Sequence, residues 1–397
     1  MNSSPAKSGI WTSSLNQQTS AWAASVPKVR FYDTTLRDGE QTVGVVFTPE
    51  QKTEIAVKLD ELDVGRIEAG FPRVSPEDAE AIRRIQQLGL RAEVWGFGRA
   101  AQADLDALVD LGVTHTILEI PASPIKLQAY GMEPEAARRK MSEGVRYAVS
   151  HGIQVAFFPV DATRANMAYL RSLYEAAAEA GAQEAVIVDT IGACGPEATE
   201  YLVRQVREWL GESIPLHYHG HNDFGMATSC AIAAVRGGAT WIQGTINGMG
   251  ERAGNADIAE VAMALHCLYG VPVEMNLSRI REVSAFVARA AGYEVDAWKP
   301  VVGRNIFVRE SGAVASQFHI PESIEPFSAD IVSAQREIVL GKKSGLDSVA
   351  LKADALNLDV PAERRKEVLE MVKARGVAKR GLITDEEFRE IVAAVGH

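Results

Sequence analysis

Three of the eight histidines in this chain lie within five residues, in the stretch His217-Tyr218-His219-Gly220-His221. They follow the short apolar run Ile214-Pro215-Leu216, which is typical of a buried strand. Strand side chains repeat every second residue, so His219 and His221 point the same way and could offer two imidazole nitrogens to a divalent cation. A polar strand end whose histidines are satisfied by hydrogen bonds is an equal alternative on this stretch alone.

Asp38 and Asn255 are candidates for the remaining ligands, through a carboxylate and a side-chain carbonyl. One carboxylate, two imidazoles and open positions suit Mn²⁺, Mg²⁺, Zn²⁺ or Fe²⁺. Arg37 could hold a substrate carboxylate in a forked hydrogen bond or stabilise an oxyanion, although an ion pair with Asp33 or Glu40 is the simpler alternative. A cation beside a guanidinium suits a 2-oxo acid, so we expect carbon-carbon bond formation or cleavage next to a carbonyl.

A repeated alternation of apolar runs and amphipathic segments must position these residues. It starts at residue 28 and occurs eight times in roughly 250 residues, which predicts an α/β fold, a (β/α)8 TIM barrel, with an open doubly wound sheet as the alternative. The expected strands are residues 29–32, 66–69, 92–96, 116–120, 154–159, 185–188, 215–218 and 241–246. The unusual residues follow strands one, six, seven and eight, so they should meet at the C-terminal mouth of the barrel.

The remaining sequence predicts three further segments. Residues 1–27 read as a disordered or docking N-terminal tail, in which Trp11 and Trp22 could dock, and residues 28–275 as the catalytic barrel. Residues 276–330 read as a helical and irregular linker near the active site or a dimer partner. Residues 331–397 read as a small, mostly helical C-terminal subdomain whose charge runs form a solvated face.

Composition excludes several classes of function. The net charge of -11 argues against nucleic acid or an anionic membrane as a partner. Three cysteines without a CxxC spacing predict neither a disulfide framework nor a zinc ribbon, and fit a reducing cytoplasm. No apolar stretch is long enough to cross a bilayer.

Three motifs in this order resemble the signatures of the homocitrate synthase and 2-isopropylmalate synthase family. They are Asp33-Thr34-Thr35-Leu36-Arg37-Asp38-Gly39-Glu40-Gln41, His219-Gly220-His221-Asn222-Asp223 and Asn247-Gly248-Met249-Gly250-Glu251-Arg252-Ala253-Gly254-Asn255. Members of this family condense acetyl-CoA with a 2-oxo acid, release CoA, and form homodimers in which the linker crosses to the partner barrel.

The resemblance assigns roles to residues of this chain. It implies Asp38, His219, His221 and Asn255 as metal ligands and Arg37 as the catalytic or substrate-orienting cation. It implies acetyl-CoA contacts from the loop residues Gly248, Gly250, Glu251, Arg252 and Gly254. We expect substrate contacts from Arg37, Gln41, Thr190, Ser123 and Arg164, although Thr190 could instead cap the next helix.

Two departures from the family pattern affect proton transfer. Relatives read Ser-x-Glu-Asp after strand five, where this chain has Val160 at the glutamate position. Relatives read His-Glu-Ser-Gly-Ile-His in the linker, where Val314 replaces the final histidine. Glu310 and His319 are therefore our candidates for acid-base work, with Asp161 and Glu68 as further ones.

Cations near the predicted loops suggest an anionic substrate. Arg73, Lys126 and Arg309 would suit the distal carboxylate of 2-oxoglutarate or the phosphonate of phosphonopyruvate, giving a homocitrate-like product or 2-phosphonomethylmalate, as in the phosphonomethylmalate synthase branch. Each could equally be a solvated surface charge. The other hypotheses are a 2-isopropylmalate or citramalate type of synthase, a lyase of the same fold, and a non-catalytic metal-binding homologue.

Overall fold

Eight parallel strands form a closed barrel in this computed structural model, which describes residues 9–395. The strands pair in sequence order, and the pairing of β1 with β8 closes the ring. This confirms the (β/α)8 barrel and excludes the open sheet. The strands are β1 (Arg30–Asp33), β2 (Arg66–Glu68), β3 (Glu93–Arg99), β4 (His115–Pro121), β5 (Gln154–Val160), β6 (Glu184–Asp189), β7 (Leu216–Gly220) and β8 (Trp241–Gly244).

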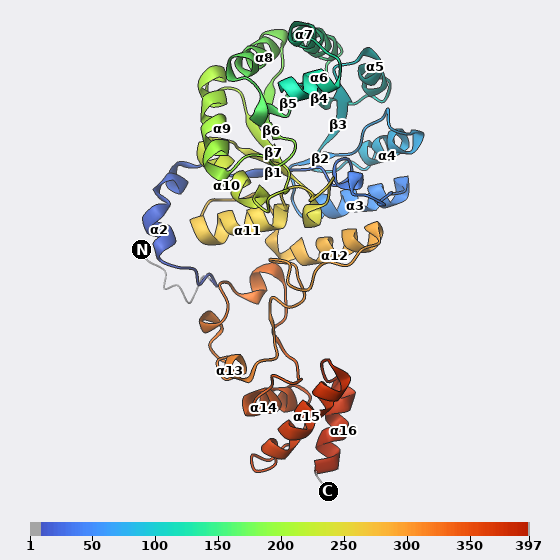
Figure 1. Cartoon of the computed structure of the whole chain (residues 1–397). Helices are drawn as coiled ribbons and strands as arrows, with labels where there is room; N and C mark the ends of the chain where they lie inside the picture. Colours follow the sequence, from blue (N-terminus) through green and yellow to red (C-terminus); the bar gives the residue numbers. More distant parts are fainter. Residues whose placement is uncertain (1–8, 396–397) are drawn as a thin grey trace. The chain divides into compact units, whose positions relative to one another are not determined.

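Helices surround the strands in the order that the sequence predicts (Figure 1). They are α3 (Pro49–Glu61), α4 (Pro76–Gln86), α5 (Gln102–Asp110), α6 (Pro124–Ala129), α7 (Pro134–Ser150), α8 (Met167–Ala180), α9 (Pro196–Leu210), α10 (Ala227–Gly237), α11 (Ile258–Tyr269) and α12 (Ile280–Ala291). Short 3-10 turns η1 to η7 occur along the described chain, at Ala21–Ser25, Gly39–Gln41, Ala162–Arg164, Ile246–Gly248, Leu277–Arg279, Pro321–Ser323 and Ala329–Val332.

Local chemistry sets the helix boundaries. Helix α3 begins in a capping box, because Thr48 Oγ1 accepts from Gln51 N at 3.2 Å and Gln51 Oε1 accepts from Thr48 N at 2.9 Å. Helices α8 and α11 end at Gly181 and Gly270, whose φ angles of 108° and 66° suit a residue without a Cβ. A glycine therefore ends each of these two helices.

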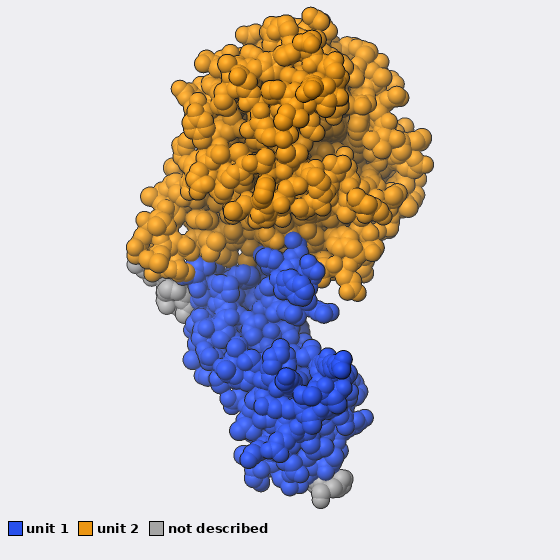
Figure 2. All heavy atoms as spheres, viewed as in Figure 1, with its two compact units in different colours: residues 1–12, 296–397 blue, residues 13–295 orange. Residues whose placement is uncertain are grey.

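The described residues form two compact units, residues 13–295 and residues 9–12 with 296–395 (Figure 2). The first unit holds the barrel and extends through α12 into the segment predicted as a linker. The boundary at residue 296 thus divides the predicted 276–330 linker between the units.

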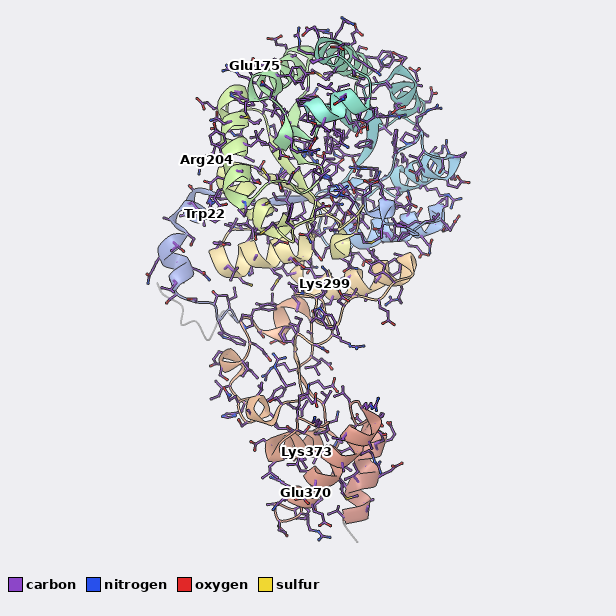
Figure 3. All side chains as sticks on the ribbon, in the orientation of Figure 1. Trp22, Glu175, Arg204, Lys299, Glu370 and Lys373 are labelled. Atoms are coloured by element: carbon purple, nitrogen blue, oxygen red, sulfur yellow. The ribbon has the colours of Figure 1, made fainter. Side chains whose placement is uncertain are left out.

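The N-terminal segment is more ordered than the sequence predicts. Residues 9–27 contain α2 (Leu15–Thr19) and η1, which corrects the expectation of a mostly disordered tail for this part of it; residues 1–8 lie outside the described range. The Trp22 ring, labelled in Figure 3, lies 5.2 Å from the Tyr269 ring at the end of α11. This is the kind of docking that the indole side chain suggests.

The second unit is built from two short strands and four helices. Strands β9 (Val308–Arg309) and β10 (Glu337–Ile338) are parallel, and the helices are α13 (Gly312–Ala315), α14 (Leu346–Ala355), α15 (Arg365–Lys379) and α16 (Asp385–Val395). Val372, Phe388 and Ile391 belong to one buried core. Glu370 and Lys373 on α15 are exposed, as expected for charge runs on a solvated face (Figure 3). Within residues 9–395, no helix is both long and apolar enough to cross a membrane.

Candidate active site and metal centre

Asp38, His219 and His221 form a buried cluster at the C-terminal mouth of the barrel. Each offers one ligand atom, and these atoms all lie within 4.8 Å of one another. Asp38 Oδ2 is 3.5 Å from His219 Nε2 and 3.8 Å from His221 Nε2. The structure therefore brings together the three residues that the sequence predicts as metal ligands.

Backbone and side-chain hydrogen bonds hold the loop that carries Asp38. Asp33, at the end of β1, accepts from Thr35 N at 2.8 Å and from Thr35 Oγ1 at 3.0 Å. Thr35 Oγ1 in turn accepts from Ile246 N at 2.9 Å, which ties the loop to the segment after β8. The turn after β1 is thus fixed at both ends before any ligand binds.

Asn255 reaches the cluster because the loop after β8 pairs with the end of β7. Asn222 N donates to Gly254 O at 2.9 Å, and Ala256 N donates to Gly220 O at 3.1 Å. Asn255 Nδ2 donates to Asp38 Oδ1 at 2.9 Å, while its Oδ1 is buried without a partner. Its position beside Asp38 suits the predicted fourth ligand, a role that stays a prediction.

The donor set fits a divalent metal ion. Nδ1 of His219, Nδ1 of His221 and Oδ1 of Asn255 are buried polar atoms with no hydrogen-bond partner among the described residues. Burial lowers the pKa of His219 to about 3, so its imidazole is neutral. Burial alone raises the pKa of Asp38, but Arg37 and the two histidines outweigh it and lower that pKa to about 2. Neutral imidazoles beside an ionised carboxylate are what a metal site requires.

Arg37 is held by two carboxylates. Its Nη1 donates to Asp38 Oδ2 at 3.0 Å and its Nε to Glu68 Oε2 at 2.7 Å. Its Cζ lies 4.2 Å from the centre of the Phe97 ring, and its Nη2 is buried without a partner. The alternative of an ion pair with Asp33 or Glu40 is wrong, because the carboxylate partners are Asp38 and Glu68. The guanidinium is instead oriented so that one donor remains for a ligand.

Ser123, Thr190 and Arg164 all bind Asp161 at the ends of β4, β5 and β6. Asp161 has a left-handed φ of 64°, and its N donates to Thr190 Oγ1 at 2.8 Å. Arg164 Nε donates to Asp161 Oδ1 at 2.8 Å, and the Ser123 hydroxyl donates to Oδ2. Thr190 does not cap α9, whose N-cap is Gly195. The substrate contacts predicted for these residues remain predictions, because their polar atoms have protein partners here.

The glycine-rich loop after β8 is tightly folded. A Cβ at Gly254 would lie 1.8 Å from Gly248 O, and Gly254 has a φ of 80°, so only glycine fits. Gly250 N donates to Thr42 Oγ1 at 2.8 Å. Arg252 Nε donates to Asp223 Oδ1 at 2.9 Å, whereas Glu251 is exposed. Backbone from this loop therefore approaches the mouth closely, as the predicted acetyl-CoA contacts require.

Three further residues predicted for the site have other surroundings. Gln41 is exposed in η2. Glu310 and His319 belong to the 296–395 unit, where Glu310 Oε2 pairs with Lys343 Nζ at 2.8 Å and His319 is exposed. Their acid-base role stays a prediction. Arg309 is no free substrate cation, because it donates to the backbone oxygens of residues 306 and 308.

Sequence reasoning missed two features of the mouth. Phe97 and Phe158 form an aromatic wall with ring centres 6.1 Å apart, and the Phe158 ring lies 5.2 Å from that of His219. Glu119 lies on β4 beside this wall. An acidic residue inside the otherwise apolar run 116–120 is the signal that could have identified it.

Comparisons with known proteins agree with this geometry. The sequence matches the HMGL-like family over residues 28–287. It is 42% identical to homocitrate synthase AksA of Methanopyrus kandleri over 93% of this chain and 92% of that protein. It is 38% identical to 2-isopropylmalate synthase of Methanocaldococcus jannaschii, over 93% of this chain and 72% of that one.

A solved structure shares the fold. Hydroxymethylglutaryl-CoA lyase from Pseudomonas aeruginosa superposes with a TM-score of 0.62 at 18% identity, covering 68% of this chain and 95% of that one. At this identity the likeness concerns the barrel alone. Together with the matches above, the chain belongs to the HMGL-like family, within its homocitrate synthase and 2-isopropylmalate synthase group, and is an enzyme.

Proposed function

We propose that this enzyme condenses acetyl-CoA with a 2-oxo acid in a metal-dependent Claisen-type reaction and releases CoA. The observation that carries the proposal is the Asp38, His219 and His221 cluster with the unpartnered Nη2 of Arg37 beside it. The similarity to homocitrate and 2-isopropylmalate synthases, which covers 93% of this chain in both cases, supports the acetyl-CoA-dependent reaction over other chemistry at such a site.

The protein groups around the cluster have clear roles in this reaction. A divalent ion held by Asp38, His219 and His221 would supply Lewis-acid polarisation of the oxo acid carbonyl. Arg37, oriented by Glu68, donates its free N–H to the substrate oxygen on which negative charge develops. Phe97 and Phe158 exclude water beside it, which strengthens both interactions.

We propose an anionic side chain on the oxo acid, of the 2-oxoglutarate or phosphonopyruvate type. Arg73 lies in the loop after β2, and Lys126 lies in the short helix α6 after β4, so both are at the C-terminal side of the barrel. Neither side chain makes a hydrogen bond or ion pair within residues 9–395, whereas Arg37, Arg164 and Arg252 all have carboxylate partners. Two uncommitted cations in these two segments favour a second acidic group on the substrate.

An uncharged side chain is the second candidate. The aromatic wall of Phe97 and Phe158 next to His219 favours an alkyl group, as in a 2-isopropylmalate or citramalate type of synthase. The two candidates place the substrate side chain in different directions. Arg73 and Lys126 lie beyond the ends of the strands, whereas the two phenylalanines lie on the strands themselves.

A panel of 2-oxo acids separates the candidates. Thiol release is measured with acetyl-CoA, Mn²⁺ or Mg²⁺, and 2-oxoglutarate, phosphonopyruvate, pyruvate or 2-oxoisovalerate in turn. We expect the highest kcat/KM with one of the first two. Good turnover of 2-oxoisovalerate with none of either anionic acid would reject the anionic substrate. No thiol release with any acid would instead favour the lyase or the non-catalytic homologue.

We further propose a homodimer, acting in the cytoplasm. Exposed apolar side chains gather on the loops after the strands, including Val43 at 94%, Val46 at 81%, Val74 at 68% and Phe224 at 80% exposure. We call these four side chains the apolar rim. An exposed apolar rim is unusual around a site that must exclude water, and a second copy of the chain would cover it. The three cysteines are free thiols, which fits a reducing compartment.

Sedimentation tests the dimer. The wild-type protein should sediment at twice the chain mass of 42.9 kDa. Replacing Val46 and Phe224 by serine should shift it toward the monomer, while Leu268→Ser, an exposed leucine on α11, should leave the dimer intact. A monomeric wild type, or a dimer indifferent to the rim, would contradict this proposal.

A further inference from the structure

The direction of β4 places Glu119 inside the barrel. A Cβ on Gly144 of α7 would lie 3.4 Å from Leu118 Cδ1, so Leu118 faces the helix layer. Successive strand residues point to opposite faces, and His115 on the same strand lies 5.1 Å, ring to ring, from the buried Trp95. His115, Ile117 and Glu119 therefore face the interior, with Glu119 nearest the mouth.

The strands on either side place Glu119 beside the reacting end of the site. Glu119 is paired with Arg99 on β3 and with Phe158 on β5. Phe158 also faces the interior, since its ring lies 5.2 Å from that of His219. Phe158 therefore neighbours both Glu119, its partner on β4, and His219, a predicted metal ligand. Neighbouring strands lie about 4.8 Å apart, so the carboxylate reaches into the substrate space beside the metal centre.

Other carboxylates at the mouth are committed to protein partners. Glu68 holds Arg37 and Tyr32, and Asp161 holds Ser123 and Arg164. Asp33 accepts two hydrogen bonds from Thr35, and Asp189 accepts one each from Thr163 Oγ1 and the N atoms of residues 193 and 194. None of these four has its oxygens free for a substrate proton.

Glu119 differs from them. Its side chain makes no hydrogen bond and no ion pair within the described part of the chain. The charged groups that face it are Arg37, Arg99, Asp104 and Lys126, with the Tyr130 phenol nearby. Arg99 is itself engaged by Asp104 at 2.7 Å and 3.0 Å. Burial raises the pKa of Glu119, which makes its carboxylate a stronger base than an exposed one.

Strand β5 offers no carboxylate at this level of the mouth. Its inward residue beside Glu119 is Phe158. Val160, two residues further along β5, is paired with Pro121 of β4 and carries no ionisable group. On this strand pair the carboxylate therefore comes from β4.

We propose that Glu119 is the catalytic base that takes a proton from the methyl group of acetyl-CoA, an assignment that rests on the proposed condensation. One carboxylate oxygen accepts the proton, and the C–H electron pair moves into the enolate of the thioester. The enolate carbon then forms a bond to C2 of the oxo acid, and the carbonyl π pair becomes an alkoxide beside Arg37. That alkoxide takes up a proton from water, and Glu119 gives its proton back to the solvent. A water molecule then hydrolyses the thioester, which releases CoA as the thiol and leaves a carboxylic acid.

The test compares Glu119→Gln and Glu119→Asp with the wild type and with Glu175→Gln. Glu175 is a partly exposed carboxylate on α8, paired with Arg171 outside the barrel (Figure 3). We expect Glu119→Gln to lower kcat by about 10²–10⁴-fold while the KM for the oxo acid and the Mn²⁺-induced rise in Tm stay near wild type. Glu119→Asp should keep part of kcat, and Glu175→Gln all of it.

A deuterium isotope effect distinguishes the base from a structural role. With acetyl-CoA carrying a CD3 group, the isotope effect on kcat should be larger in Glu119→Gln than in the wild type, because proton removal becomes slower. A variant that keeps kcat within about fivefold, or loses it with no change in isotope effect and with a lost Mn²⁺ response, would overturn the assignment. A wild type that releases no CoA with any 2-oxo acid would overturn the proposed function as well, so the two failures are distinct.

Discussion

Replacing Asp38 by asparagine is expected to lower the rate of CoA release by at least about 10³-fold, because a metal ion contributes several kcal/mol to charge stabilisation. Asp38 is the only carboxylate in the cluster with His219 and His221 among the described residues. The amide keeps the size of the side chain but removes the charge that attracts a cation. It also removes the anionic partner of Arg37 Nη1, which lies 3.0 Å away.

Metal binding should fail together with activity in this variant. Isothermal titration with Mn²⁺ is expected to give a clear wild-type signal and none for Asp38→Asn, and adding Mn²⁺ should raise the Tm of the wild type only. Asp63→Asn is the matched control. Asp63 lies before β2 at the opposite end of the barrel, and its left-handed φ of 61° is one that asparagine tolerates well. Unchanged Mn²⁺ binding in Asp38→Asn would remove Asp38 from the metal site.

The barrel could be predicted from sequence because each unit repeats the same local signals. Pro134–Ser150, Met167–Ala180 and Pro196–Leu210 lie where proline, periodic apolar residues and glycine bound them. The metal cluster followed from the barrel, since all parallel strands end at one mouth. Asp38 and Asn255, which are 217 residues apart in the sequence, become neighbours through that closure. The metal cluster, whose residues follow the ends of strands, could therefore be predicted from the sequence.

Hydrogen-bond partners that depend on the direction of a side chain could not be predicted from the sequence. The sequence offered Asp33 and Glu40 to Arg37, yet the partner is Glu68, which β2 brings in at a separation of 31 residues. Ser123, Asp161 and Arg164 were weighed separately, although they form one group. Glu119 was overlooked because a five-residue apolar run does not reveal which of its faces is the interior. Register and twist decide these contacts, and a single sequence carries neither.

The floor of the barrel contains a charged cluster that should dominate stability. Arg66 on β2 donates to Glu184 on β6 from Nη1 at 2.6 Å and from Nη2 at 2.8 Å. His217 on β7 also hydrogen-bonds to this carboxylate, and Gln243 Nε2 lies 3.2 Å from His217 Nδ1. If Gln243 donates to Nδ1, the imidazole carries its proton on Nε2 and donates to Glu184. All of these groups point into the barrel, where water cannot replace a lost partner.

Glu184→Gln is therefore expected to lower the free energy of unfolding by about 3–5 kcal/mol at neutral pH, because it leaves the Arg66 guanidinium buried with only the half-exposed Glu93 as a counter-charge. Chemical denaturation measures the difference. Glu80→Gln is the matched control, since Glu80 also binds two arginines, Arg83 and Arg84, but on the surface of α4, where little change is expected. An equal loss of unfolding free energy in Glu184→Gln and Glu80→Gln would show that burial of the Arg66 and Glu184 cluster does not add to stability.

The same pair predicts how stability varies with pH. Burial raises the pKa of Glu184, but the hydrogen bond from His217 and the pairing with Arg66 outweigh it and lower that pKa to about 2, below the ordinary value of 4.5. The unfolded chain therefore binds the proton more readily than the folded one, so the stabilisation is fully present above about pH 4.5 and is lost as the pH falls toward 2. The gap between wild type and Glu184→Gln should narrow over that interval. A gap that stays constant down to the lowest pH at which the barrel remains folded would mean that Glu184 acts through its shape and not through its charge.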